Sequence, residues 1–205
     1  MFKGFLLVFL VFTSVAFSQT GGESTFLILN TSTSARQIAL GGKVLTLTDD
    51  VNQPIWNPAS IALNLDRKLA VNYTSYIGDI SIGSVSYAHR LNRHLNPFHG
   101  HITYVNYGTL IGADEDGNET STFNASDIVM SIGYAHPVKN SHFRIGSNLK
   151  FIHSSIANFS STGLALDLAV VYHHSKKPYT LAFVTRNIGT QITSFNGTIE
   201  KLPLE

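Results

Sequence analysis

Histidine side chains are the groups in this 205-residue sequence whose type and spacing could bind a transition metal. Nine histidines occur, with His94, His99 and His101 close in sequence and His173 beside His174. Adjacent residues of a strand point to opposite faces, and no cysteine or carboxylate lies at ligand spacing beside His173 and His174. We prefer to interpret these histidines as residues of strand ends and turns without a ligand role, so we expect no metal site.

The acidic segment 114–119, with the sequence DEDGNE, is a second group that could bind an ion. Clustered carboxylate and amide oxygens around a glycine turn are chemistry that suits calcium. The segment lacks the third ligand position before the glycine and the distant bidentate glutamate of a complete twelve-residue calcium loop. A solvated loop is therefore the preferred interpretation.

Catalytic arrangements are not evident in the sequence. No serine, histidine and aspartate pattern resembles a nucleophile elbow, and no glycine-rich loop could cradle a phosphate. The formal net charge of +1 gives no basic field for nucleic acid. We therefore expect a protein that is not an enzyme, needs no cofactor and does not bind nucleic acid.

Four charged residues fall on the polar side of predicted strands, where they could face the lumen of a barrel. They are Arg144, Lys150, Asp167 and Arg186. They could tune a lumen, but the preferred interpretation is ion pairing among themselves that fills a narrow barrel.

The elements that must position these charges are strands. From Phe143 to His153 apolar and polar residues alternate, and the same period of two continues through 162–173 and 179–187. Segments of about ten alternating residues are typical of strands that cross a membrane. The pattern predicts seven strands: Leu69 to Tyr76, Ile80 to Arg90, Gly100 to Leu110, Asp127 to Ala135, Phe143 to Ser154, Thr162 to His173 and Tyr179 to Asn187.

Alternation alone also fits a soluble sandwich, whose apolar face points inward. Aromatic residues favour the membrane interpretation, because Tyr134, Phe143, Tyr172 and Tyr179 mark strand ends that would share one level in an up-and-down sheet. Aromatic belts are favoured at bilayer interfaces. The composition agrees with a membrane barrel, since only 13% of residues are charged.

The N-terminus has the pattern of a secretory signal peptide. Lys3 precedes an apolar run from Phe5 to Phe12, and small residues around Ala16 to Ser18 predict cleavage after residue 18. The chain has no cysteine, so neither a disulfide scaffold nor a lipid anchor on cysteine is expected. We predict residues 1–18 as the signal peptide.

Residues 19–65 lack the alternation of apolar and polar residues that is typical of strands. We predict that they form a short helical plug segment inside or beneath a barrel. Ser34 could cap a helical turn from Ala35 to Leu40 that Gly41 and Gly42 end. The structural motif Asn57, Pro58 and Ala59 predicts a second helix start, with Asn at the N-cap and Pro in the first turn. The single tryptophan, Trp56, is interpreted as a packing anchor.

Residues 66–205 are predicted to form the N-terminal part of an outer-membrane β-barrel. The longest connection, Ile111 to Ser126, and the connection Ser155 to Ser161 should face outward, and the turn 136–140 should face the periplasm. An odd number of antiparallel strands, here seven, cannot close a membrane barrel without an unpaired strand edge. The sequence therefore predicts a chain that is truncated relative to a complete barrel.

Several short motifs resemble the PorQ family of outer-membrane barrel proteins of the type IX secretion system. Those in the first 65 residues are TGGESTF at 20–26, SAR at 34–36, ALGG at 39–42, DD at 49–50 and NPA at 57–59, and those in the strand region are YVNYG at 104–108, ADEDGNE at 113–119 and RNIGTQ at 186–191. The SAR, LGG and NPA motifs are shared more widely with PorV and the FadL-like transporters.

This resemblance implies an all-β fold, an antiparallel up-and-down transmembrane β-barrel preceded by the plug segment and located in the cell outer membrane. It further implies contact with outer-membrane lipid and a non-enzymatic role in type IX secretion, in which the barrel anchors the surface partner PorZ and supports attachment of cargo. The alternative is a FadL-like transporter of hydrophobic small molecules. A soluble sandwich secreted into the periplasm is a third hypothesis.

Overall fold

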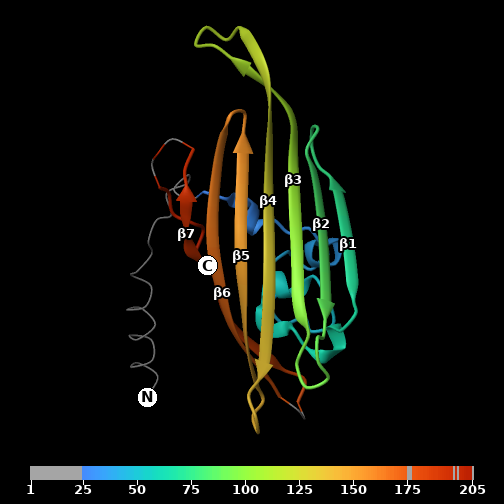
Figure 1. Cartoon of the computed structure of the whole chain (residues 1–205). Coiled ribbons are helices and arrows are strands. Elements are labelled where there is room, and N and C mark those ends of the chain that lie inside the picture. Colours follow the sequence, from blue (N-terminus) through green and yellow to red (C-terminus); the bar gives the residue numbers. More distant parts are fainter. Residues whose placement is uncertain (1–24, 175–176, 196, 198, 205) are drawn as a thin grey trace, which may run out of the picture.

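The fold is a single curved antiparallel sheet of seven strands in a computed structural model that describes residues 25–174, 177–195, 197 and 199–204. The strands pair in sequence order, from β1 to β7 (Figure 1). Their bounds are β1 Leu69–Ser75, β2 Ser81–His89, β3 Phe98–Ala113, β4 Glu119–Pro137, β5 Phe143–Ile156, β6 Phe159–His173 and β7 Thr180–Thr193. The predicted all-β, up-and-down order of seven strands is confirmed.

Two predicted connections are wrong, because the strands beside them are longer than the alternation indicated. β3 continues to Ala113 and β4 begins at Glu119, so most of the predicted loop Ile111 to Ser126 is a hairpin that projects beyond its neighbours (Figure 1). β5 and β6 likewise leave only residues 157 and 158 between them. Both extensions are rich in Ser, Thr and Asn, so apolar and polar residues do not alternate clearly in the sequence there. The backbone hydrogen bonds between the strands continue because they do not depend on side-chain polarity.

The N-terminal segment contains only short helices and lies against one face of the sheet, here called the inner face (Figure 1). Its elements are η1 Leu27–Asn30, α2 Ala35–Ala39, η2 Gln53–Ile55, η3 Pro58–Ser60 and η4 Leu63–Leu65. No helix among the described residues has the length and apolar character needed to cross a membrane. The predicted signal peptide, residues 1–18, lies outside the described residues.

The predicted helical turns are present in the N-terminal segment, with one difference at a cap. Helix α2 follows Ser34 and ends before Gly41 and Gly42, which both have φ of 94°. Ser34 makes no side-chain capping hydrogen bond, although its backbone is extended as an N-cap requires. Asn57 does cap η3, since its side chain accepts a hydrogen bond from the Ala59 N–H.

The core lies between the N-terminal segment and the inner face. Phe26, Ile28 and Leu29 pack with apolar residues of β2 to β6, chiefly Ile82, Val105, Val129, Ile152 and Ala165. Two smaller clusters join Val51 and Leu65 to Ala88, and Ala59 to Ala169 and Val171. Small inner-face residues allow this close approach, as at Gly146, where an added Cβ would lie 2.4 Å from the Ala59 nitrogen.

The opposite face of the sheet, here called the outer face, is apolar and exposed. The alternation of buried and exposed residues places one large hydrophobic side chain outward at nearly every second position of β5 and β6. These exposed side chains are Phe143, Ile145, Leu149, Phe151, Leu164, Leu166 and Leu168, and those on neighbouring strands include Val85, Tyr87, Ile102, Tyr104, Met130, Ile132, Leu181 and Phe183. Nothing among the described residues covers this face.

Candidate functional site

Five polar residues of β5, β6 and β7 form the candidate site, here called the inner polar cluster: Asn148, Lys150, Asp167, Arg186 and Asn187. All five are buried on the inner face, beneath the N-terminal segment. The strand period explains why Asn148, Lys150 and Asp167 lie together: residues two apart on β5 share a face, and Asn148 pairs with Asp167 on β6. Charged groups so deeply buried must find partners inside the protein.

The Asp167 carboxylate is the centre of the inner polar cluster. Lys150 Nζ lies 2.7 Å from Asp167 Oδ2, and Asn148 donates to the same oxygen at 3.3 Å. The backbone N–H of Asn187 donates to the other oxygen at 2.9 Å, and Lys150 also donates to Asn187 Oδ1 at 3.0 Å. Opposite charges and hydrogen bonds therefore compensate for the loss of hydration on both sides of this buried pair.

A β-bulge in β7 places Arg186 and Asn187 in the inner polar cluster. Leu166 pairs with Ile188 and Leu168 pairs with Thr185, so both intervening residues of β7 lie opposite Asp167. Asn187 has φ of 60°, a left-handed conformation that asparagine adopts more readily than most residues. The bulge points two consecutive side chains inward, which regular alternation would not do.

Arg186 connects the sheet to the N-terminal segment. Its Nη2 donates to the Leu29 carbonyl at 2.9 Å, and its Cζ lies 4.2 Å from the centre of the Trp56 ring. Trp56 in turn donates from Nε1 to Gln37 Oε1 at 2.9 Å. Trp56 is thus a buried packing residue that also receives a cation over its ring, an interaction that gains strength away from water.

The motif Asn57, Pro58 and Ala59 is a second attachment of the N-terminal segment, at β5. Asn57 Nδ2 donates to the Leu45 carbonyl at 2.6 Å, and Gly146 of β5 lies directly beneath Pro58 and Ala59. Nearby, Asn148 Nδ2 donates to the Pro54 carbonyl at 2.6 Å. The motif therefore orders its own loop and fits a position on the sheet that lacks a side chain.

Arg144, the fourth predicted lumen charge, does not join the inner polar cluster. It lies six residues before Lys150 on β5, which is about 20 Å along a strand. Its Nη1 is 3.5 Å from the Ala59 carbonyl, and its Nε is buried without a hydrogen-bond partner. The preferred interpretation of internal pairing thus applies to Lys150 and Asp167, while Arg144 has no ion pair within the described part of the chain. The prediction that these charges face the lumen of a closed barrel stays a prediction.

The histidines singled out in the sequence do not gather into one site, although His99 and His101, both within β3 rather than in a turn, stack with ring centroids 6.4 Å apart. His99 and His101 are buried on the inner face, where His99 Nε2 lies 2.8 Å from the Val51 carbonyl and His101 Nδ1 lies 2.8 Å from Ser86 Oγ. His94 belongs to the connection between β2 and β3, and His173 ends β6. Across the described ranges, no three His, Cys, Asp or Glu side chains gather as metal ligands.

The acidic segment 114–119 forms the tip of the β3–β4 hairpin. Asp114 Oδ1 accepts hydrogen bonds from the backbone N–H groups of Asp116 and Asn118, and Oδ2 accepts one from Asn118 Nδ2 at 3.1 Å. These bonds, first that from the Asn118 side chain, hold the pKa of Asp114 below its ordinary value. The carboxylate is thus used to order its own turn.

Sequence reasoning missed two members of the inner polar cluster. Asn148 has the parity of Lys150 and could have been selected on that ground, whereas Asn187 breaks the parity and is oriented inward only by the bulge. The contact of Arg186 with Trp56 likewise joins residues far apart in the chain, and the sequence holds no local signal for it.

Neither the protein-family models nor the curated proteins include a match to the chain.

Proposed function

We propose that this protein is a non-enzymatic outer-membrane β-barrel component of the type IX secretion system, in which it anchors a surface partner and supports cargo attachment. The observation that carries the membrane part of the proposal is the polarity of the sheet. Lys150 and Asp167 are buried on the inner face, while Leu149, Phe151 and Leu166 are exposed on the outer face. A soluble sandwich would direct its apolar face inward.

The outer face supports insertion into lipid through its residue types and their positions. Aromatic rings gather at the end of the sheet where β6 meets β7, with Phe143 and Tyr172 centroids 5.1 Å apart and Tyr172 and Tyr179 centroids 6.3 Å apart. Rings with a polar edge are favoured at a bilayer interface. The sheet would then form part of a barrel wall, with β1 and β7 continuing into further pairing, because an open edge is costly in lipid.

The N-terminal segment would act as the plug of this barrel. It fills the inner face with apolar contacts and is connected to the sheet by Arg186, Asn148 and the Gly146 position. A closely filled interior favours an anchoring role over the alternative of a FadL-like transporter, which needs a passage for its substrate.

The assignment to type IX secretion depends on the resemblance of the 20–26, 104–108, 113–119 and 186–191 motifs to the PorQ family. Deletion of the gene should release proteins that carry the type IX C-terminal signal from the cell surface into the medium. The surface partner, PorZ in that family, should be released with them. Normal attachment of both in the deletion strain would contradict the secretion role.

Two further measurements separate the alternatives. Uptake of fatty acids should be unchanged in the deletion strain, and a clear loss of uptake would favour the transporter. The protein should also partition into detergent extracts of outer membranes; recovery in the soluble periplasmic extract would favour the sandwich hypothesis.

A further inference from the structure

A cavity at one end of the sheet lies outside the inner polar cluster and has different chemistry. It has a volume of about 390 Å³ and is bounded by the β4–β5 connection, the end of β6 and the N-terminal segment. Ala62 and Val171 contribute apolar surface, and Arg144, His142 and His173 contribute cationic or potentially cationic groups. His142 and His173 are exposed, so the cavity is reached from solvent.

Arg144 has unused hydrogen-bonding capacity at this cavity. Its Nε is buried without a partner, and its one protein contact from Nη1, to the Ala59 carbonyl, is long at 3.5 Å. A guanidinium offers five donors in a planar fork, and leaving a buried charged donor unsatisfied is costly. Arg144 also lines the cavity, so an oxyanion there would give the guanidinium a further acceptor beside the distant Ala59 carbonyl.

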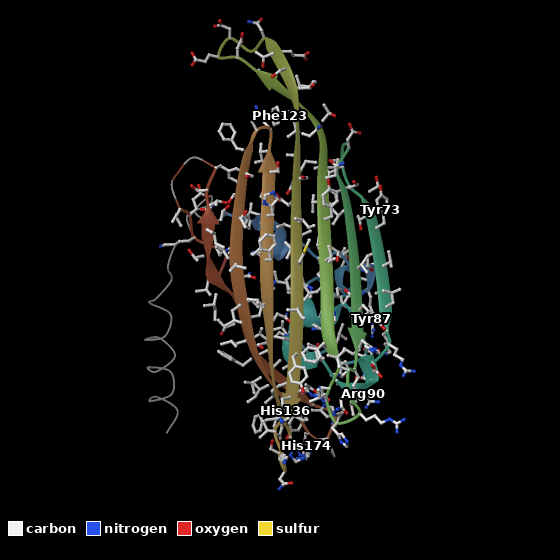
Figure 2. The ribbon with its side chains drawn as sticks, in the orientation of Figure 1. Tyr73, Tyr87, Arg90, Phe123, His136 and His174 are labelled. Atoms are coloured by element: carbon white, nitrogen blue, oxygen red, sulfur yellow. The ribbon has the colours of Figure 1, made fainter. Side chains whose placement is uncertain are left out.

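The surroundings of the cavity also favour an anion. No Asp or Glu lines it among the residues that the structure describes. The Nδ1 of His173 lies 2.9 Å from Thr180 Oγ1, so its Nε2 is the nitrogen that remains for a ligand. Figure 2 shows His136 and His174 at the same end of the sheet, whereas the acidic hairpin tip is at the other end. The carboxylates of the tip therefore do not repel an anion at the cavity mouth.

We propose that this cavity binds the phosphate group of a small molecule or a lipid headgroup, with Arg144 as the principal contact and His142 and His173 beside it. Three basic side chains match a phosphate better than a carboxylate, because a phosphate offers more oxygens and up to two negative charges. The volume exceeds that of the phosphate group alone, so the ligand carries a small organic body against Ala62 and Val171.

Titration calorimetry on the full chain in detergent tests the proposal, with glycerol 3-phosphate and a short-chain phosphatidylglycerol as separate probes and glycerol as the uncharged reference. We expect at least one phosphate probe to bind and glycerol not to bind. Binding of glycerol 3-phosphate would identify a soluble phosphate ester as sufficient, whereas binding of phosphatidylglycerol alone would assign the site to a lipid headgroup. Failure of both probes would overturn the proposal.

Variants of Arg144 provide the specific test. Arg144→Gln should weaken binding about tenfold to hundredfold, the range expected for losing a charge-assisted hydrogen bond, and Arg144→Lys should weaken it less. Arg90→Gln is the matched control, because Arg90 already lies 3.9 Å from Asp66 and does not line the cavity. Unchanged affinity in Arg144→Gln, or equal losses in Arg144→Gln and Arg90→Gln, would contradict the assignment. Circular dichroism of each variant checks that the sheet is retained.

Discussion

Lys150 and Asp167 form an ion pair of 2.7 Å across the diagonal of two adjacent strands, and both side chains are buried. Lys150 is directly opposite Ala165, and Asp167 is directly opposite Asn148, so the two charges meet only because both strands direct these positions to the inner face. The small side chain of Ala165 leaves the lysine room to reach along β6. The pair therefore depends on the register of β5 against β6.

Replacing Lys150 with Met should destabilise the protein by about 3–5 kcal/mol, because it leaves Asp167 as an uncompensated buried charge. The double change Lys150→Met with Asp167→Leu should cost less, since the remaining charge is removed as well. Denaturant unfolding in detergent, followed by the fluorescence of the single Trp56, measures both. Arg36→Ala is the control, because Arg36 and Asp49 form an exposed pair whose loss should cost about 0–1 kcal/mol. Equal effects of Lys150→Met and Arg36→Ala would contradict this account.

Asn187 should be more tolerant of Gly than of Ala. Both changes remove the hydrogen bond that Lys150 donates to the Asn187 side chain, but only Ala is also strained at φ of 60°. The difference should be about 1 kcal/mol in unfolding free energy. The same denaturant titrations measure it, and Thr185→Ala, beside the bulge, serves as a control. A more stable Ala variant would show that the left-handed conformation is not retained.

Gly146→Ala should loosen the N-terminal segment. The added methyl group would lie 2.4 Å from the Ala59 nitrogen and the Pro58 carbonyl carbon, so the Asn57-Pro58-Ala59 turn must move away from β5. A cost of about 1–3 kcal/mol and faster proteolysis between residues 40 and 60 are expected. Gly100→Ala is the matched control, because its Cβ would meet no atom within 4 Å. Equal proteolysis of the two variants would argue against the close contact.

Cysteine labelling tests the proposed orientation in the outer membrane. The native chain has no cysteine, so single changes at Asp116, in the hairpin tip, and Asn140, in the β4–β5 turn, give specific probes. Asp116→Cys should react with an impermeant maleimide in intact cells, and Asn140→Cys only after the outer membrane is opened. The reverse pattern would invert the topology, and equal labelling would argue against membrane insertion.

The hairpin tip should lose order in acid. The pKa of Asp114 is held below its ordinary value of 3.8, chiefly by the Asn118 side chain, so the ionised carboxylate stabilises the turn above that pH. This contribution is lost as the pH falls through the lowered pKa. Asn118→Ala should raise the pKa of Asp114 toward 3.8, as measured by the carboxyl carbon shift in an NMR titration. Asn106→Ala, which removes a bond to Gly108 instead, should leave that pKa unchanged.

Alternation in the sequence was sufficient to predict seven antiparallel strands, because the period of two is imposed on every strand that has one apolar and one polar face. It failed where Ser, Thr and Asn interrupt the alternation, as in the β3–β4 hairpin and at residues 155–161, since backbone pairing continues there with only isolated apolar residues. Asn57 capping was predictable for a similar local reason: the cap bond joins residues two apart.

The sequence by itself therefore determined the strand number, the two faces of each strand and the inward parity of Lys150, Asp167 and Arg186, because these depend on residues close together in the chain. Only the tertiary structure decided which inward charges meet. Register brought Lys150 to Asp167, the bulge brought Asn187 beside them, and the position of the N-terminal segment put Trp56 against Arg186 and left Arg144 at a cavity. Those contacts join residues up to about 130 positions apart, since 186 − 56 = 130, and their energies depend on burial that no local pattern records.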